Sequence, residues 1–407
     1  MQYTLGIIVP IYNKQEYLRR TVDSLLDQTY RPIEIVLVDD GSVDDSAQIC
    51  DEYASRFSNI SVLHQSNQGL INSRMNGVKS ITTQWITFVD GDDWVDNTFF
   101  SMLMEPINAD ENVATCIGSY VYDYGYEIKE AFDFKAERGW VQNVLLDMFN
   151  RKGYDWSACG KIYRKSILEE LPNWWYASPY GEDTELNWKY FSYNNRAFLV
   201  PTTGYHYCIN RDSMMRNLSD DSLFYFERMN RILEEVGDSK SLLYQAVNET
   251  ILSMAIYEID QLTIETNASM RSKLQNEIDK AKRRKLLREY GLETDDDLDR
   301  ALLKEKEELE LFCSRHKYVY IYGAGHFGMQ AWDYLHGLRC LVVGFIVSPG
   351  HIDGDRINGI KVIEMNKGSI PNGSGVIVAI KNAHEVLPRL IECEIDMNDI
   401  YIWHCHE

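Results

Sequence analysis

The sequence predicts an α/β protein in which two sheet-forming regions flank a helical one. Strand and helix patterns alternate through the first hundred residues, which is typical of a parallel, doubly wound sheet. From Asp220 to about Arg315 the apolar spacing becomes helical, and then the alternation returns. We therefore expect three parts: residues 1–215, a helical bridge or insert at 216–315, and a small Rossmann-like domain at 316–407.

Apolar runs in the first hundred residues predict four buried strands, and the segments between them have the spacing of amphipathic helices. We expect the strands at 5–13, 33–42, 59–67 and 84–94 and the helices at 16–28, 44–57 and 69–81. Polar side chains stand where strands end: Tyr12 and Asn13 after the first, Asp39 and Asp40 after the second, and the acids from Asp90 after the fourth. Open parallel sheets bind ligands at the carboxyl ends of their strands, so these groups should face one crevice.

The rest of the chain is less regular until its last ninety residues. Residues 113–215 mix strand and helix signals with many aromatic side chains, and helical segments follow at 222–236 and 242–262. After a charged helical stretch, we expect strands at 317–322, 341–348, 375–382 and 400–404 and helices at 326–338 and 383–394. This alternation predicts the small Rossmann-like domain.

The charge balance argues against nucleic acid as a partner. The 407 residues include 41 Lys and Arg against 62 Asp and Glu, a formal net charge of -21. Such a surface repels a phosphate backbone unless a basic patch overrides it. The nearest candidate, the basic run at 280–285, stands between acidic helical stretches and is typical of a solvated helix face.

Cysteine usage and hydropathy favour a cytoplasmic location. The eight cysteines form no CxxC pair and no zinc-ligand spacing, which is typical of free thiols in a reducing compartment. The amino terminus lacks the pattern of a signal peptide, and there is no run of about 18 apolar residues that would predict a membrane span. Peripheral attachment to a membrane is left open.

Four short motifs occur in a fixed order along the chain. They are IVPIYN at 8–13, VDDGSVD at 38–44, DGD at 90–92 and GED at 181–183. In these motifs the amino-terminal half of the chain resembles bacterial family 2 glycosyltransferases, which adopt the GT-A fold. The resemblance implies an enzyme that transfers a sugar from a nucleotide diphosphate donor to a hydroxyl acceptor and inverts the anomeric carbon.

The DGD motif is the candidate metal site. Asp90 and Asp92 flank a tight turn and offer hard oxygen ligands to one Mn²⁺ or Mg²⁺ ion, which would neutralise the donor diphosphate and assist its departure. The resemblance implies that Asp92 coordinates the metal directly, while Asp90 bonds the ribose and the waters of the metal. A turn that only faces solvent is the alternative for an isolated triplet, and Asp93 is open to a role as a helix cap.

The resemblance also implies a site for the donor nucleotide. Asp40 matches an aspartate that accepts a hydrogen bond from the uracil ring. Pro10 and Tyr12 would line the base, and Asn13 follows them in the same motif. Arg74 lies where the family often has a segment near the donor phosphates. The alternatives are that Asp40 caps the turn after it and that Arg74 has a surface role.

The GED motif supplies the candidate catalytic base. A sugar hydroxyl is a poor nucleophile until its proton is taken up during attack. The family assigns this task to an aspartate that Asp183 matches, with Glu182 as the fallback. The same segment is also typical of a helix start, where acids are favoured. The two interpretations are compatible, because a helix amino terminus fixes the position of a base.

A later loop carries a weaker signal. YHYCINRDSMMRN resembles a segment that closes over the donor diphosphate. By this resemblance Arg211 and Ser213 are candidates for phosphate contacts and His206 for a metal contact. A lone histidine among aromatic residues is more often structural.

The GAGHFG segment opens the C-terminal domain. Its glycines directly follow an expected strand, as in a dinucleotide-binding fingerprint. The acid expected at the end of the next strand is missing, because Ser348 and Pro349 stand there. We therefore expect a role in packing, oligomerisation or acceptor handling rather than in binding a redox cofactor.

Three functions compete, and we predict the first. A hexosyltransferase, with galactose or glucose on UDP as donor and a glycan or glycosylated protein as acceptor, accounts for all four motifs. An NAD-dependent sugar oxidoreductase accounts for GAGHFG but leaves the first two hundred residues without a purpose. A non-catalytic nucleotide-sugar binding module is disfavoured because both the DGD and the GED acids are present.

Overall fold

The computed structural model of the chain forms two compact units, which are described separately. They comprise Met1–Ala281 and Lys282–Glu407. The division falls within the stretch that the sequence assigns to a helical bridge, and the three-part division at 215 and 315 stays a prediction. The structure describes residues 2–125, 127–130, 137–150, 156–172, 181–209, 223–261, 268–338, 340–350, 356–357, 359–380 and 382–403.

The first unit is built on an eight-stranded sheet in the order β3-β2-β1-β4-β10-β6-β11-β9. Its parallel half consists of β1 (Leu5–Ile11), β2 (Ile33–Asp39), β3 (Ile60–His64) and β4 (Trp85–Phe88). The other half consists of β10 (Lys161–Arg164), β6 (Thr115–Ile117), β11 (Ala197–Leu199) and β9 (Gly139–Val141). The four parallel strands confirm the doubly wound sheet that the alternating pattern predicts. Strand β10 runs antiparallel to both of its neighbours, β4 and β6.

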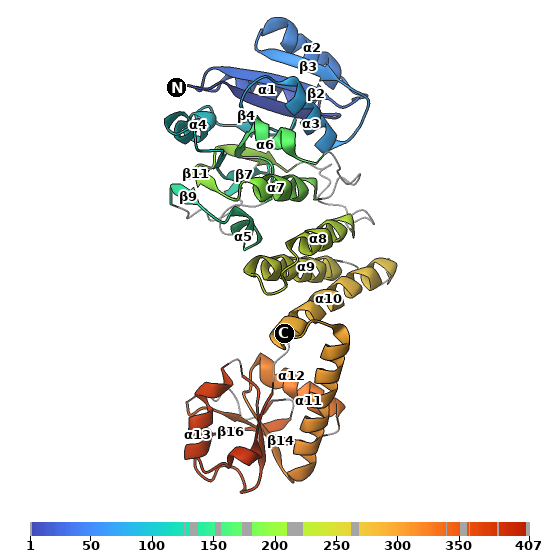
Figure 1. Ribbon diagram of the computed structural model, residues 1–407, viewed down its shortest axis with the longest axis vertical. Coiled ribbons are helices and arrows are strands. Elements are labelled where there is room, and N and C mark those ends of the chain that lie inside the picture. The colour runs from blue at the N-terminus through green and yellow to red at the C-terminus, as the bar shows by residue number, and fades with distance from the viewer. Residues whose placement is uncertain are drawn as a thin grey trace. The chain divides into compact units, whose positions relative to one another are not determined.

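Helices cover both faces of this sheet, and β1 shows why (Figure 1). Leu5, Ile7 and Val9 of this fully buried strand enter one core, while Ile8 enters the other. The first core contains α1 (Leu18–Leu26), α2 (Ser46–Arg56) and α4 (Phe99–Ala109). The second contains α3 (Leu70–Ser80), α5 (Val144–Phe149), α6 (Lys165–Glu170) and α7 (Glu182–Tyr193). Strands buried on both faces read as continuous apolar runs, as β1 does.

A smaller sheet and three helices complete the first unit. The sheet consists of β5 (Trp94–Val95), β12 (Tyr205–Cys208), β7 (Tyr120–Asp123) and β8 (Ile128–Glu130), in that order. The helices are α8 (Leu223–Val236), α9 (Leu242–Gln261) and α10 (Ala268–Glu289). Their apolar residues, up to Ala281 of α10, join the core that contains α3 and α7.

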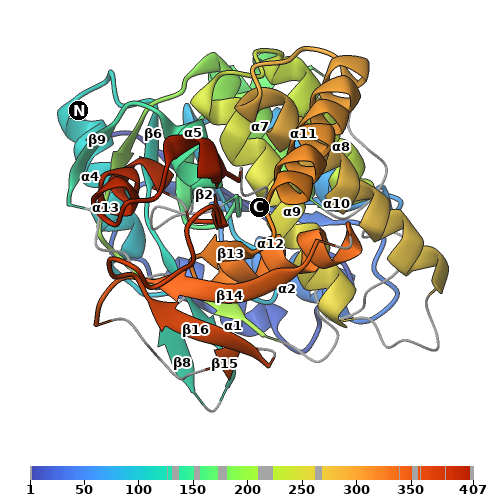
Figure 2. The same cartoon turned by 90° about the horizontal axis from the view of Figure 1, so that it is seen from below.

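The second unit begins in α10, continues through α11 (Asp295–Arg315) and contains a six-stranded sheet. The sheet order is β15-β16-β14-β13-β17-β18, and Figure 2 shows β13, β14 and β16 side by side. The strands are β13 (Val319–Tyr322), β14 (Val342–Val347), β15 (Arg356–Ile357), β16 (Ile360–Glu364), β17 (Gly375–Val378) and β18 (Ile400–Ile402). All are parallel except β15, and this is the strand order of a Rossmann-type sheet.

The glycines of GAGHFG allow close packing in this unit. The segment leads from β13 into α12 (His326–Gly337), and α13 (Leu387–Glu392) follows later in the chain. A Cβ atom at Gly328 would lie 1.9 Å from the carbonyl oxygen of Gly323, so only glycine fits there without a backbone shift. The turn of this segment is therefore closely packed, and the role of the domain in packing, oligomerisation or acceptor handling stays a prediction.

Candidate active site

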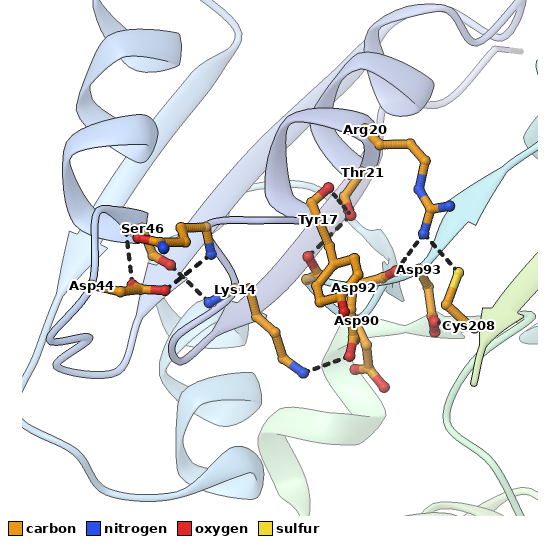
Figure 3. Close-up of polar contacts among 12 residues, drawn as sticks. Lys14, Tyr17, Arg20, Thr21, Asp44, Ser46, Asp90, Asp92, Asp93 and Cys208 are labelled. Atoms are coloured by element: carbon orange, nitrogen blue, oxygen red, sulfur yellow. Dashed lines mark hydrogen bonds and ion pairs between the residues drawn. The ribbon is translucent and has the colours of Figure 1, made fainter. Parts of the chain in front are cut away.

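The DGD motif forms a turn that is bonded to the rest of the parallel sheet. It follows β4, and the Asp93 N–H donates to the Asp90 carbonyl oxygen at 3.0 Å. The Thr21 hydroxyl of α1 donates to the Gly91 carbonyl oxygen at 3.1 Å (Figure 3). A Cβ atom at Gly91 would lie 3.1 Å from the Pro10 carbonyl oxygen, so the turn packs directly on the end of β1. The turn therefore has a fixed place at the carboxyl edge of the sheet.

The three acids of the turn have different partners. Asp90 pairs with the Arg74 guanidinium at 3.0 Å. Asp92 pairs with the Lys14 ammonium at 2.5 Å (Figure 3). Asp93 is buried and accepts hydrogen bonds from the Tyr205 hydroxyl at 2.7 Å and from a backbone N–H of β12 at 2.8 Å. Burial and the charges of Asp90 and Asp92 raise the pKa of Asp93 well above its usual value. Asp93 thus binds the turn to the smaller sheet rather than capping a helix.

Arg74 joins the DGD turn to the GED motif. Its side chain on α3 is 1% exposed, and one guanidinium nitrogen pairs with Asp90 while the other pairs with Asp183. Burial lowers the pKa of Arg74, but the charges of Asp183 and Asp90 outweigh this effect and raise it. The alternative of a surface role for Arg74 is wrong, because the side chain is buried between two carboxylates. Its predicted contact with donor phosphate stays a prediction.

Asp183 and Glu182 begin α7, after Gly181 in the left-handed conformation (φ 76°). Asp183 accepts a hydrogen bond from the Ala158 N–H at 2.8 Å in addition to its pair with Arg74. Burial raises the pKa of both acids, and the charge of Asp183 raises that of Glu182 further. Arg74 bonds only to Asp183 of the two, and its charge opposes the rise of the Asp183 pKa. Pairs of acids with such different surroundings are typical of sites that use one of them as a base.

The loop after β1 is bonded to the loop after β2. Pro10 is buried at the end of β1, whereas Tyr12 is 45% exposed. Asn13 has a φ of 54°; its N–H donates to the Ser42 hydroxyl at 3.1 Å, and its side-chain oxygen accepts from the Val43 N–H at 2.9 Å. An exposed aromatic ring beside a fixed loop is a suitable wall for a nucleotide base. The roles of Pro10, Tyr12 and Asn13 toward a nucleotide stay predictions.

Asp40 is buried and holds the loop that leads into α3. Its carboxylate accepts hydrogen bonds from the backbone N–H groups of Gln68 and Gly69, both at 2.8 Å, and from the Gln65 amide at 2.7 Å. Each carboxylate oxygen has two lone pairs, so Asp40 keeps capacity for a further donor. Its predicted bond to a uracil ring stays a prediction.

His206 lies in β12, beside the first strand of the smaller sheet. Its ring stacks on Trp94 with centroids 3.4 Å apart, and its Nε2 atom lies 3.0 Å from an oxygen of Asp96. The described contacts therefore place His206 with Asp96 rather than with Asp92, and its role as a metal ligand stays a prediction. Arg211 and Ser213 lie outside the described residues.

A comparison with protein families decides the class of this site. Residues 6–172 match the model of glycosyl transferase family 2. This range contains the DGD turn and its partners Lys14 and Arg74. The chain contains a family 2 glycosyltransferase domain.

Curated relatives of the family 2 domain include bacterial glycosyltransferases. Glycosyltransferase GlyA of Streptococcus pneumoniae is 31% identical over 52% of this chain and 31% of its own length. The glycosyltransferase EpsJ of Bacillus subtilis is 34% identical over 40% of this chain and 49% of its own length. The cholesterol galactosyltransferase of Borreliella burgdorferi is 32% identical over 42% of this chain and 49% of its own length. The chain thus spans half or less of the length of these relatives.

Among solved structures, the chain is similar to residues 1–349 of TarS from S. aureus, determined in complex with UDP-GlcNAc. The TM-score is 0.57 at 19% sequence identity, over 69% of this chain and 81% of that one. At this identity the likeness concerns the fold. It confirms the GT-A fold that the four motifs predict for the family 2 domain.

The residues of the turn suit a hard divalent cation. Among the described residues, ligand atoms of Asp90, Asp93 and Cys159 lie within 4.8 Å of one another. Burial raises the pKa of the Cys159 thiol well above its usual value, so this group stays neutral and is a poor ligand for such a cation. Carboxylate oxygens are the ligands that Mn²⁺ and Mg²⁺ prefer, and Asp90 and Asp92 provide them in the turn that packs on the end of β1.

Sequence reasoning missed two residues that bond to the acids of the DGD turn. Lys14 follows the IVPIYN motif and pairs with Asp92, although no local pattern connects positions so far apart. Tyr205 donates to Asp93 and also accepts the Asp90 N–H at 3.2 Å. The only signal for Lys14 was its place directly after a strand end.

None of the described helices is long and apolar enough to cross a membrane.

Proposed function

We propose that the chain is an inverting hexosyltransferase that moves a sugar from a UDP donor to a hydroxyl of a glycan or glycosylated protein. The observation that carries the proposal is the bridge of Arg74 between Asp90 and Asp183. It gathers the donor motif and the base motif, which are remote in the sequence, into one site at the carboxyl edge of the sheet. A transferase needs both in the same place, because the attacking hydroxyl must meet the anomeric carbon.

Two comparisons support the donor. TarS is described in complex with UDP-GlcNAc, and one relative is named as a galactosyltransferase. The first supports a sugar carried on UDP and the second supports galactose, and galactose or glucose is the favoured hexose. The described cysteines are free thiols, which supports a reducing compartment such as the cytoplasm.

Asp90 and Asp92 would hold Mn²⁺ or Mg²⁺, which when bound neutralises charge on the departing diphosphate. Asp183 takes up the proton of the acceptor hydroxyl during attack. Its pair with Arg74 fixes the direction of the carboxylate and opposes the rise of its pKa on burial, while the N–H of Ala158 donates to the other oxygen. Attack from the face opposite the leaving group inverts the anomeric carbon, so an α-linked donor gives a β-glycoside.

The test combines a donor screen with one variant. Hydrolysis of UDP-glucose, UDP-galactose and UDP-GlcNAc identifies the donor, and turnover is then compared for Asp183→Asn and the exposed control Asp27→Asn. Loss of a general base costs about 10² to 10⁴ in turnover. We expect Asp183→Asn to show this loss while its affinity for UDP is unchanged, and Asp27→Asn to behave as wild type. Normal turnover in Asp183→Asn would move the base to Glu182 or elsewhere, and an α-linked product would exclude inversion.

A further inference from the structure

Lys14 is fixed over the DGD turn by the loop that follows β1. Its backbone N–H donates to the Ser46 hydroxyl of α2 at 2.8 Å, so the main chain is held at this point. The side chain packs over Gly91, where a Cβ atom would lie 3.4 Å from Lys14 Cγ. Its ammonium reaches Asp92 at 2.5 Å, as Figure 3 shows. The lysine therefore contacts the carboxylate for which a metal contact is proposed.

Arg74 and Lys14, the two cations that pair with the turn, differ in how easily each can leave its carboxylate partner. The Arg74 side chain is 1% exposed and pairs with carboxylates of two motifs. The Lys14 side chain is 33% exposed and pairs with Asp92, whose side chain is 17% exposed. Lysine is a point charge on a flexible stem, whereas the arginine fork is rigid. Lys14 is thus the cation that can be exchanged.

The charge of the turn explains why Lys14 lies there. Three carboxylates stand within four residues, and a cation is needed to offset their mutual repulsion. The ammonium therefore offsets the negative charge of the turn as a divalent cation would, but with half the charge.

We infer that Lys14 competes with the divalent cation for Asp92 and, once displaced, turns its ammonium toward the donor diphosphate. The inference rests on the proposed function, because it takes a metal and a diphosphate to bind at this turn. A backbone fixed by Ser46 keeps the displaced ammonium close to the turn. The lysine then restrains metal binding before the donor arrives and favours the charged donor afterwards.

The first experiment measures Mn²⁺ affinity without nucleotide, by calorimetry and by the electron paramagnetic resonance signal of free Mn²⁺. Partly exposed ion pairs contribute up to about 1 kcal/mol, so Lys14→Met should bind Mn²⁺ up to about fivefold more tightly than wild type. Lys79→Met, an exposed lysine of α3, is the matched control and should not change the affinity. Circular dichroism checks that each variant is folded, and Lys14→Gln replaces Lys14→Met if the latter is not.

Unchanged or weaker Mn²⁺ binding by folded Lys14→Met, with wild type binding normally, would overturn the competition and leave the proposed function intact. Absence of Mn²⁺ binding by both proteins would overturn the metal dependence of the proposed function as well.

The second experiment compares UDP with uridine at saturating Mn²⁺. Uridine lacks the diphosphate, so Lys14→Met should weaken the binding of UDP and leave that of uridine unchanged. Equal affinity of wild type and Lys14→Met for UDP would overturn the contact with the diphosphate.

Discussion

The carboxylates of the proposed site lie close together but depend on different partners. Asp92 pairs with an exchangeable lysine, Asp90 and Asp183 share a buried arginine, and Asp93 is held by hydrogen bonds from β12. Substitution of Asp92 should therefore affect ligand binding, whereas loss of the arginine shared by Asp90 and Asp183 should affect the stability of the fold. Two predictions separate these effects.

Asp92→Ala should abolish the part of UDP affinity that depends on metal. In the proposed site the variant removes an oxygen ligand of the cation. The diphosphate needs that cation, because the protein itself is strongly acidic. Calorimetry with Mn²⁺ and with excess EDTA measures the difference for variant and wild type. The two proteins should agree in EDTA and differ in Mn²⁺; wild-type affinity in Asp92→Ala would place the metal elsewhere.

Arg74→Met should destabilise the protein by about 3–5 kcal/mol, because it leaves two partly buried carboxylates without their cation. Chemical denaturation measures the free energy of unfolding. Arg56→Met provides the control, since this arginine is exposed and its pair with Glu52 lies at the surface. A loss in Arg74→Met no larger than in the control would contradict the structural role of the bridge.

His64 should titrate above the ordinary histidine pKa of about 6.5. Hydrogen bonds to Asp39 and, as the second cause, to Asp51 favour the charged ring and raise its pKa. The stabilisation from this pair is therefore fully present below the unfolded-state pKa and is lost as pH rises through the folded-state pKa. Nuclear magnetic resonance of the imidazole should show a lower pKa in Asp51→Asn than in wild type. An unshifted wild-type pKa would be inconsistent with this pair.

The site residues that stand in short sequence motifs were predictable, whereas the contacts between distant residues were not. Asp90, Asp92 and Asp183 stand in short patterns, whereas the burial of Arg74 depends on how α3 packs near α7. Neither the pair of Lys14 with Asp92 nor that of Tyr205 with Asp93 follows from spacing, because the partners meet only in the folded sheet.

At the scale of elements, long strands and helices were predictable and short ones were not. β1 and β2 have seven residues each and a continuous apolar pattern. β5 has two residues and β6 three, which is too short for a periodic signal. Strand β16 was not predicted either, because its burial is mixed, with Val362 buried and Lys361 exposed.

Gly328→Ala tests an element contact in the second unit. The added Cβ would lie 1.9 Å from the Gly323 carbonyl oxygen, so the start of α12 must shift. Forced shifts of this kind cost about 1–3 kcal/mol. Gly337→Ala in the same helix meets nothing within 4 Å and should be tolerated. Thermal unfolding should separate the two variants, and equal stability would contradict the close approach.

At the scale of the whole chain, donor binding should reside in the first unit. Leu309 and Phe312 of α11 belong to the core of the second unit, so a cut after α11 would expose them. A shortened chain that ends at Gly291, beyond α10, keeps the core residues of α10 covered. It should bind UDP with Mn²⁺ as the full chain does. A folded but non-binding product would show that the second unit takes part in donor binding.

The antiparallel strand β10 determines when a nascent chain can complete its sheet. Strand β4 leaves the ribosome early, yet its neighbour on one side is Lys161–Arg164, which is synthesised only after α4, β6 and α5. Until then β4 presents an apolar edge with unpaired backbone groups, the kind of edge on which chains aggregate. Arg74 is likewise synthesised before Asp183, so during synthesis its guanidinium lacks one of its two carboxylate partners. Translation pauses before residue 161 should therefore create the most vulnerable nascent form of this protein, and chaperones should engage it there.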